Sequence, residues 1–315
     1  MANILNQKNS TTPIDTMQSQ VKSILLIGMN RSGTKWLSNI FCNHSDVIGI
    51  QHQRHFGIVE TNMFGVMQAK FGELSALDDY IGFIELWSKT DFFKISGVDK
   101  ELFYKLDPRP TSYCELFDIL MSKVASNLNK PFWLQKTSPL NVYVLEKKFL
   151  RYFGDSFFIL IQRNMIDTLK SNTQLSQQRQ QSIFRIVQRV FSYTLQKKIM
   201  IYISRNYDVA LVSYEDLLIS PEKVIKGICE KIGIEYQPNM LEVFYNKNTS
   251  FSTKADRKSV FYKYQMFVIY LVYFIFQLFP LKLLSKMYEF SKRKKLVFPF
   301  VFGTFSEIKE KHNLL

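Results

Sequence analysis

Ile24-Leu25-Leu26-Ile27-Gly28-Met29-Asn30-Arg31-Ser32-Gly33-Thr34-Lys35-Trp36 is the stretch that decides the fold. Its first four residues are apolar and predict a buried strand, and a loop bounded by two glycines follows them. A helical spacing of apolar residues then begins at Trp36. A strand, a glycine-rich loop and a helix together present backbone N–H groups and a helix N-terminus to a phosphate group. We therefore expect an anion-binding loop at residues 28–35.

This loop differs from the magnesium-dependent phosphate-binding motif G-x-x-x-x-G-K-[ST]. That motif places a lysine directly after the second glycine, followed by a hydroxyl residue that binds magnesium. Here Gly33 is followed by Thr34 and only then by Lys35, and Arg31 lies inside the loop. The sequence thus predicts a phosphate cradle without the usual magnesium ligand, and we expect no bound metal.

The composition limits the partners and the compartment. The 315 residues, 46% of them hydrophobic, can bury the core of one large α/β domain or two smaller ones. A net charge of +14 favours an anionic partner such as a nucleotide, a nucleic acid or an anionic membrane surface. The three cysteines indicate no disulfide framework, and residues 1–20 are polar without the apolar core of a signal peptide. We expect a cytoplasmic protein whose first twenty residues are a disordered lead-in.

Further buried strands alternate with helical segments along the chain. The strands are predicted at residues 47–50, 133–137, 157–161 and 209–212, and the main helical segments at residues 56–130, 140–153, 172–205 and 221–232. This alternation predicts an α/β fold, a P-loop-like parallel sheet flanked by helices. We divide the chain into the lead-in, a domain at residues 21–260 and a basic, aromatic-rich C-terminal segment at residues 261–315.

In a parallel sheet, ligands bind at the carboxyl ends of the strands. Four polar segments lie at or just after the ends of predicted strands and are expected to converge there: residues 28–35, 136–137, 163 and 214–216. We expect the last of these, Tyr214-Glu215-Asp216, to order the site or cap a helix and not to take part in chemistry.

Three separated motifs resemble those of the sulfotransferases that use PAPS (3′-phosphoadenosine-5′-phosphosulfate). The resemblance rests on residues 28–36, on Ile161-Gln162-Arg163 with Ser171 eight residues later, and on supporting blocks at residues 133–139 and 214–217 followed by Pro221. It extends over residues 22–235, and the first block is most similar to the carbohydrate and tyrosylprotein branch. The resemblance implies an enzyme that transfers a sulfuryl group from PAPS to a hydroxyl group and releases PAP.

The resemblance also implies which residues bind the donor. Arg31 would contact the 5′-phosphosulfate, where charge develops only as the S–O bond breaks, and Lys136 would neutralise the transferring sulfuryl group. Arg163 and Ser171 would hold the 3′-phosphate. The complete set of expected donor-binding residues is Arg31, Ser32, Gly33, Thr34, Lys35, Trp36, Arg163 and Ser171.

A general base must remove the proton of the acceptor hydroxyl. His52 follows the predicted strand at residues 47–50, where the related tyrosylprotein enzymes carry the second of two glutamates. Histidine suits the role because it titrates near neutral pH. We therefore predict His52, Arg31 and Lys136 as catalytic residues, with His55 and Glu60 as alternatives for the base.

The C-terminal segment contains eighteen uncharged residues at positions 264–281, within a region of ten basic and two acidic residues at positions 254–295. Such a segment is typical of a helix at an anionic membrane surface, and packing on the core is the alternative. A peripheral membrane position would suit a glycan or glycolipid acceptor.

Two other classes of protein remain open at this stage. A P-loop nucleotide kinase would need a lysine directly after Gly33 and an acidic magnesium site. A non-catalytic basic protein that binds a membrane or a nucleic acid would not need the loop at residues 28–35 and the Arg163–Ser171 pair together. We expect no nucleic-acid partner.

Overall fold

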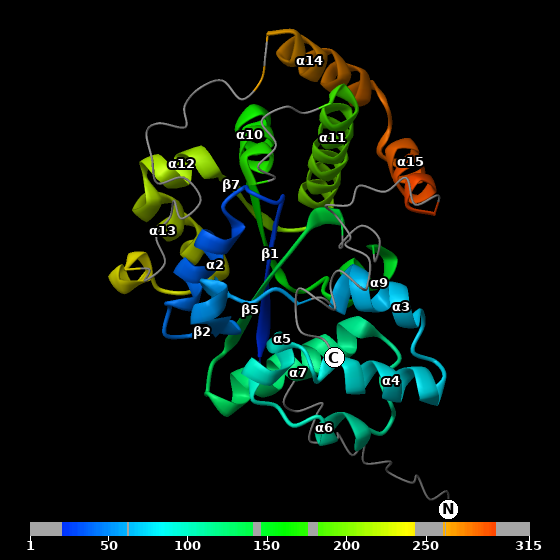
Figure 1. Cartoon of the computed structure of the whole chain (residues 1–315). Coiled ribbons are helices and arrows are strands. Elements are labelled where there is room, and N and C mark those ends of the chain that lie inside the picture. Colours follow the sequence, from blue (N-terminus) through cyan, green and yellow to red (C-terminus); the bar gives the residue numbers. More distant parts are fainter. Residues whose placement is uncertain are drawn as a thin grey trace, which may run out of the picture.

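A computed structural model describes residues 21–61, 63–140, 146–175, 182–242, 261 and 263–293. A five-stranded sheet with the order β2-β5-β1-β6-β7 crosses the centre of the molecule, and every pair of neighbouring strands is parallel (Figure 1). The strands are β1 (Lys22–Gly28), β2 (Val47–Ile48), β5 (Phe132–Thr137), β6 (Phe157–Gln162) and β7 (Val209–Ser213). The predicted parallel α/β architecture is confirmed.

The central strands are apolar on both faces because helices cover both faces of the sheet. Along β1, Leu25 and Ile27 join one hydrophobic cluster, whereas Ile24 and Leu26 join the other. All four side chains are buried. The continuous apolar run of the sequence therefore supplies two separate cores in alternation.

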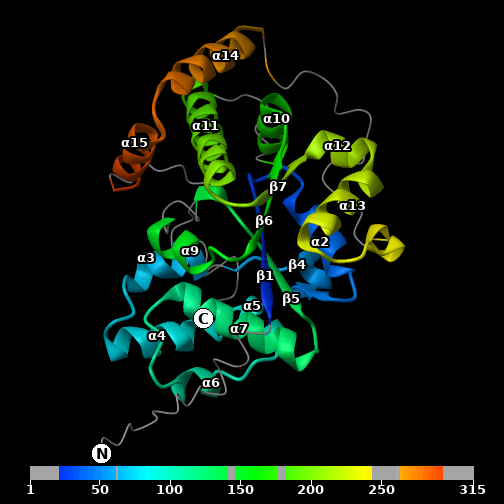
Figure 2. The same cartoon turned by 180° about the vertical axis from the view of Figure 1, so that it is seen from behind.

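The helices form one layer on each face of the sheet (Figures 1 and 2). The layer around the second cluster consists of α2 (Thr34–Cys42), α12 (Tyr214–Ile219) and α13 (Pro221–Ile232). The other layer contains α7 (Tyr113–Asn127), α9 (Glu146–Tyr152), α10 (Met165–Leu175) and α11 (Ile183–Asn206). As the sequence suggests, α13 begins at Pro221 and is capped by Gly233 in the left-handed region.

Short elements fill the segment between β2 and α7. They are a two-stranded antiparallel sheet of β3 (Gln51–His52) and β4 (Gly57–Ile58), the 3-10 turn η1 (Gln53–His55), the π-helical turn η2 (Met63–Met67), and helices α3 (Gln68–Phe71), α4 (Leu77–Trp87), α5 (Asp91–Ser96) and α6 (Glu101–Tyr104). A further 3-10 turn, η3, covers Pro238–Leu241. Aromatic rings from this region pack into the first cluster around Phe117 and Trp87.

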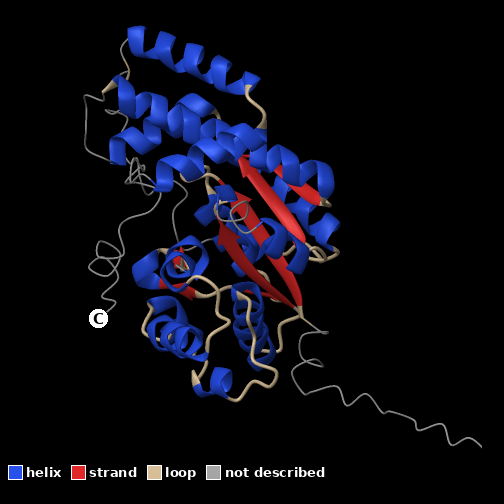
Figure 3. Cartoon of the chain, turned by 90° about the vertical axis from the view of Figure 1, so that its right-hand side faces the viewer, coloured by secondary structure: helices blue, strands red, loops and turns tan. Residues whose placement is uncertain are grey.

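The register of the sheet brings four strand ends to one edge. Gly28 pairs with Ile161, Ile27 pairs with Thr137, and Gln162 pairs with Ser213. The loops that follow β1, β5, β6 and β7 therefore leave the sheet side by side, at the end of the molecule towards α10 and α11 (Figure 3). This is the edge at which parallel sheets bind ligands.

Several predicted elements differ from the structure in extent. The strand expected at residues 47–50 ends at Ile48, because the chain then turns so that the Ile50 carbonyl accepts a hydrogen bond from the Val59 amide at 2.8 Å. The helical segment at residues 172–205 belongs to two helices, α10 and α11. Residues 176–181 between them, the lead-in at residues 1–20 and the domain boundary at residue 260 lie outside the described residues.

Two helices make up the described part of the C-terminal segment. Helix α14 (Lys263–Leu278) packs on α11, and α15 (Leu281–Arg293) follows after a break at Pro280. Within the described ranges no single helix is long and apolar enough to cross a membrane. The pair of α14 and α15, bent by 113° between them, meets that length and composition test only when taken together.

Replacing Phe117 by alanine tests the aromatic core. The ring is fully buried and contacts Phe64, Phe92 and Trp133 with centroid distances of 5.2, 5.7 and 5.7 Å. We expect Phe117→Ala to lower the free energy of unfolding by about 3–5 kcal/mol, because it leaves a cavity. Urea denaturation measures this. Phe184→Ala, which removes a ring 66% exposed on α11, should stay within about 0.5 kcal/mol of the parent.

Candidate active site

The loop after β1 folds into a tight turn around one carbonyl group. The Met29 oxygen accepts hydrogen bonds from the Ser32 amide at 3.1 Å and from the Ser32 hydroxyl at 2.6 Å. Arg31 and Gly33 both adopt positive φ angles, of 71° and 88°. Ser32 is buried, and these two donors already have an acceptor, so Ser32 shapes the loop from inside. The amides of Gly33, Thr34 and Lys35 lead into α2, where backbone N–H groups have no intrahelical acceptor.

Two features require a glycine at position 33: the positive φ angle and the close approach of the Tyr214 ring. A Cβ atom at Gly33 would lie 2.4 Å from the Tyr214 ring, which is closer than any real contact. The ring of Trp36 meets the same tyrosine edge-on, with the ring centroids 6.3 Å apart. Tyr214 therefore fixes the position of the loop from the strand end of β7. The sequence indicates only a structural residue there and does not reveal this contact.

Arg31, Arg163 and Ser171, predicted from two separate motifs, contact each other directly. The Arg31 side chain donates from Nε to the Ser171 hydroxyl at 3.0 Å. The Arg163 guanidinium donates to the backbone carbonyl of Arg31 at 2.9 Å. The predicted convergence of these three residues is confirmed as a feature of the structure. Two guanidinium groups and a hydroxyl thus lie at the carboxyl ends of β1 and β6.

Three neighbours hold Arg163 in place. Its guanidinium carbon lies 4.6 Å from the centre of the Tyr214 ring, within the range of a cation–π contact. The Tyr193 hydroxyl on α11 donates to the Arg163 carbonyl at 3.0 Å, and the Glu215 carboxylate accepts from the Asn164 amide at 2.9 Å. These contacts join the end of β6 to α11 and to the start of α12, around the Arg163 side chain and the backbone next to it.

The two arginines repel each other. Burial lowers the pKa of Arg31 below its ordinary value, and the positive charge of Arg163 lowers it further. Placing like charges together in a partly buried site raises the energy of the empty site. A bound anion would remove this repulsion, so the arrangement favours a phosphate or sulfate group.

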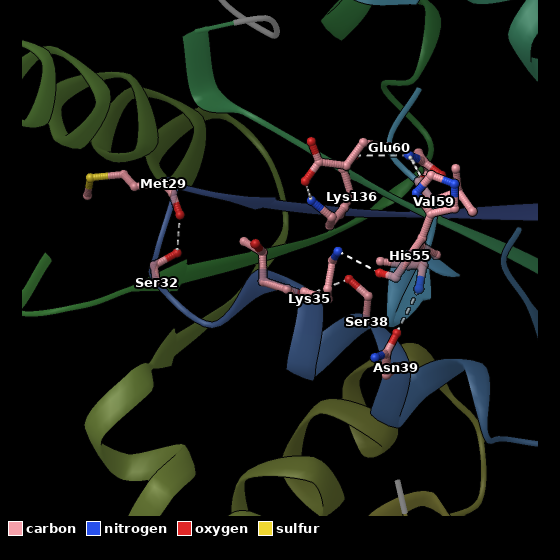
Figure 4. Close-up of polar contacts among 12 residues, drawn as sticks. Met29, Ser32, Lys35, Ser38, Asn39, His55, Val59, Glu60 and Lys136 are labelled. Atoms are coloured by element: carbon pink, nitrogen blue, oxygen red, sulfur yellow. Dashed lines mark hydrogen bonds and ion pairs between the residues drawn. The ribbon is translucent and has the colours of Figure 1, made fainter. Parts of the chain in front are cut away.

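A second cationic cluster, formed by Lys35 and Lys136, lies near Arg31. Lys35 donates to the His55 carbonyl at 2.8 Å, and Lys136 forms an ion pair with Glu60 (Figure 4). Burial lowers the pKa of Lys35, and the charge of Lys136 is the next largest cause. In Figure 4 both lysines point towards the segment that carries His55 and Glu60. Lys35, Lys136 and Glu60 are therefore close enough to act on one group.

The three candidates for the base have different environments. His52 uses its Nδ1 atom to accept a hydrogen bond from the Arg54 amide at 3.2 Å, which places the proton of the neutral ring on Nε2. His55 contacts Asp91 through Nε2 at 3.0 Å. Glu60 touches Lys136, and its side chain is 65% exposed. Glu60 is the candidate that contacts another predicted catalytic residue.

Asn39 on α2 anchors the segment that follows His55. Its side chain accepts from the Ile58 amide at 2.9 Å and donates to the Phe56 carbonyl at 3.1 Å. A Cβ atom at Gly57 would lie 2.1 Å from the Asn39 amide group, so the glycine is required for this approach. In the sequence, a polar residue within the predicted helix is the only signal for this anchoring role of Asn39, which is buried in the structure.

Among the described residues, no group of three or more His, Cys, Asp or Glu side chains is placed to hold a metal ion.

The sequence model of the sulfotransferase family matches residues 23–238, which include both cationic clusters. The chain belongs to the sulfotransferase family. The branch suggested by the first motif, that of the carbohydrate and tyrosylprotein enzymes, stays a prediction. No curated protein matches the sequence.

Solved sulfotransferase structures are similar to this sulfotransferase at low sequence identity. The sulfotransferase domain of the Synechococcus PCC 7002 olefin synthase is 13% identical, covering 86% of this chain and 95% of its own, with a TM-score of 0.47. Sulfotransferase STF1 of Mycobacterium tuberculosis H37Rv is 14% identical, covering 80% and 76%, with a TM-score of 0.46. The sulfotransferase domain from the curacin biosynthetic pathway is 14% identical, covering 72% and 78%, with a TM-score of 0.44.

Replacing Gly33 by alanine tests the contact with Tyr214 in this sulfotransferase. We expect a loss of unfolding free energy larger than the roughly 1–2 kcal/mol of a left-handed alanine alone, because the Tyr214 ring must also move. Urea denaturation measures it. Gly97→Ala is the matched control, since Gly97 has a φ of 68° and no atom within 4 Å of its Cβ position. Equal losses in the two variants would contradict the role given to Tyr214.

Proposed function

We propose that this sulfotransferase transfers a sulfuryl group from PAPS to a hydroxyl group of a glycan or glycolipid acceptor and releases PAP. The observation that carries the proposal is the presence of two neighbouring cationic clusters at the carboxyl ends of β1, β5 and β6. Arg31, Arg163 and Ser171 form one cluster, and Lys35 and Lys136 form the other. A donor with phosphate groups at its 3′ and 5′ positions needs two such clusters.

In this proposal the first cluster reaches from the 3′-phosphate to the 5′-phosphosulfate through Arg31, and the second cluster lies at the sulfuryl end of the donor. Arg163 and Ser171 bind the 3′-phosphate, while the amides of Gly33, Thr34 and Lys35 bind the 5′-phosphate at the start of α2. Ser32 keeps the turn closed, and Trp36 supports it through Tyr214. Burial, and then the neighbouring positive charges, lower the pKa of Arg31 and of Lys35; binding of the two phosphates compensates that repulsion.

The proposed reaction forms one S–O bond and breaks another. The acceptor oxygen attacks sulfur in line with the bridging oxygen of the 5′-phosphosulfate, the S–O bond to the phosphate breaks, and PAP leaves. Arg31 and Lys136 stabilise the negative charge that appears on the bridging and sulfuryl oxygens. Glu60 accepts the proton of the acceptor hydroxyl, and Lys136 transfers its contact from Glu60 to the sulfuryl group.

The proposed site of action is the cytoplasm, at a membrane. The free thiols of Cys42, Cys114 and Cys229 suit a reducing compartment. The net charge of +14 suits an anionic membrane surface. A glycan or glycolipid acceptor attached to that membrane would present its hydroxyl to the carboxyl edge of the sheet.

Binding of PAP and AMP tests the donor. We expect PAP to raise the melting temperature and to bind more tightly than AMP, because only PAP carries the 3′-phosphate. Arg163→Ala should lower PAP affinity by roughly tenfold to a hundredfold and leave AMP affinity nearly unchanged, since one charge-assisted contact is lost. Calorimetric titration measures both affinities. Arg205→Ala, at an exposed position near the end of α11, is the control.

Equal binding of PAP and AMP would contradict the proposal. Magnesium-dependent turnover of ATP would support a nucleotide kinase instead. Loss of both ligands in Arg163→Ala, together with a lower melting temperature of the free protein, would mean that the variant has lost its fold, and Ser171→Ala would then test the same contact.

Turnover of labelled PAPS in Glu60→Gln and His52→Ala tests the base. We expect Glu60→Gln to lower kcat by about a hundredfold or more while PAP affinity stays within a few-fold, because only proton transfer is lost. His52→Ala should cost less than roughly tenfold in kcat. The reverse ranking would assign the base to His52, as the sequence predicts.

A further inference from the structure

Helices α14 and α15 lie at the outer side of the molecule (Figures 1 and 2), and many of their apolar side chains are exposed. On α14 the exposed residues recur every three or four positions and so share one face of the helix. We call this region the α14–α15 surface; it consists of Tyr264, Phe267, Tyr270, Leu271, Phe274, Ile275, Leu278, Leu283, Met287 and Phe290. The side chains of Phe267 and Leu278 are each 68% exposed, so the surface is not covered by the described chain.

The opposite face of α14 packs on the protein. Ile269 is buried in the first cluster, and the Phe276 ring meets Phe191 of α11 edge-on, with the centroids 5.2 Å apart. Lys197 donates to the Tyr273 hydroxyl at 2.9 Å, and Lys198 donates to the Gln277 carbonyl at 2.9 Å. The inner face of α14 therefore combines apolar packing with hydrogen bonds to α11, whereas its outer face exposes aromatic and aliphatic side chains.

The α14–α15 surface lies among positive charges. Residues 261–293 contain five basic residues and one acidic residue, Glu289. Lys282 and Lys286 are exposed on α15, each adjacent in sequence to an apolar member of the surface, Leu283 and Met287. Aromatic and aliphatic side chains bordered by lysines match the interface of an anionic bilayer, where rings enter the headgroup region and lysines meet the phosphates.

We propose that the α14–α15 surface docks on an anionic lipid bilayer and that the protein lies on the membrane without crossing it. A spanning position would surround α14 with lipid and place Lys197 and Lys198 of α11 in the hydrocarbon region, which is costly. The break at Pro280 and the bend of 113° also suit two helices lying along an interface. The docking does not depend on the proposed sulfuryl transfer, because it uses none of the donor-binding residues.

The docking surface is close to the nucleotide site. Tyr273 on α14 contacts the Tyr193 ring, with the centroids 6.2 Å apart, and the Tyr193 hydroxyl donates to the Arg163 carbonyl. Tyr273 and Tyr193 therefore connect α14 to the arginine proposed to bind the 3′-phosphate. A membrane held by this surface would lie beside the edge of the sheet where an acceptor must enter.

Co-sedimentation of the full chain with lipid vesicles tests the docking. We expect binding to vesicles of phosphatidylcholine and phosphatidylglycerol that is at least about tenfold tighter than to phosphatidylcholine alone and that weakens at high salt. Phe267→Ser/Phe274→Ser should weaken binding by about tenfold or more, because two apolar anchors are lost. Lys282→Glu/Lys286→Glu should weaken it by about tenfold or more through lost attraction. No PAPS is present, so failure of the sulfotransfer proposal would not affect the result.

The controls change similar residues elsewhere. Ile219→Ser removes a side chain that is 80% exposed on α12, and Lys223→Glu reverses an exposed charge on α13; both should bind vesicles like the parent. Thermal melting followed by circular dichroism confirms that each variant is folded. The charge variant keeps the test decisive if the double serine variant does not fold.

Three results would overturn the proposal. They are an absence of vesicle binding, equal binding to neutral and anionic vesicles, and unchanged binding in the charge variant. Light scattering provides a further check: a dimer that Phe267→Ser/Phe274→Ser converts to a monomer, with vesicle binding unchanged, would assign the surface to a second copy of this chain.

Discussion

The functional edge of the molecule depends on keeping two positive charges side by side. Arg163 donates to the carbonyl of Arg31, and Arg31 donates to Ser171, so one loop and one helix hold both guanidinium groups. Burial and the neighbouring charge of Arg163 lower the pKa of Arg31, as expected where two like charges are held in a partly buried site. The packing of Tyr214, the positive φ of Gly33 and the burial of Ser32 all serve this arrangement. The fold thus holds the guanidinium groups of Arg31 and Arg163 close together, and a bound anion would reduce the repulsion between them.

Where the sequence carries local information, it predicts the structure well. One continuous apolar run before Gly28 and another before Arg163 each specify a buried strand, and parallel pairing then brings the residues after each strand to one edge. The meeting of Arg31, Arg163 and Ser171 follows from this topology, because Gly28 pairs with Ile161 in the register of the sheet. The order and spacing of the motifs are therefore enough to predict which groups converge.

The sequence says little about contacts between segments that are far apart. The fit of Gly33 against Tyr214 and the approach of Asn39 to Gly57 join residues that no local pattern links. The same limit applies to the prediction of the general base. Its predicted position depends on distance along the chain from the loop, which selects His52, whereas the pairing of Lys136 with Glu60 depends on how β5 and the segment after β4 pack together. Such pairs are fixed by close packing of the whole domain and not by periodicity.

Helix α11 joins the site to the C-terminal helices. Tyr193 and Lys197 are one turn apart on this helix; the first donates to the Arg163 carbonyl and the second to the Tyr273 hydroxyl on α14. Because a close-packed interior adjusts little, α14 cannot leave α11 without exposing Ile269 and removing the support of Tyr193. The C-terminal helices are therefore part of the structure that positions Arg163. In the proposed membrane docking, the contact from Tyr273 through Tyr193 to Arg163 links the helix that meets the bilayer to the arginine proposed to bind the donor.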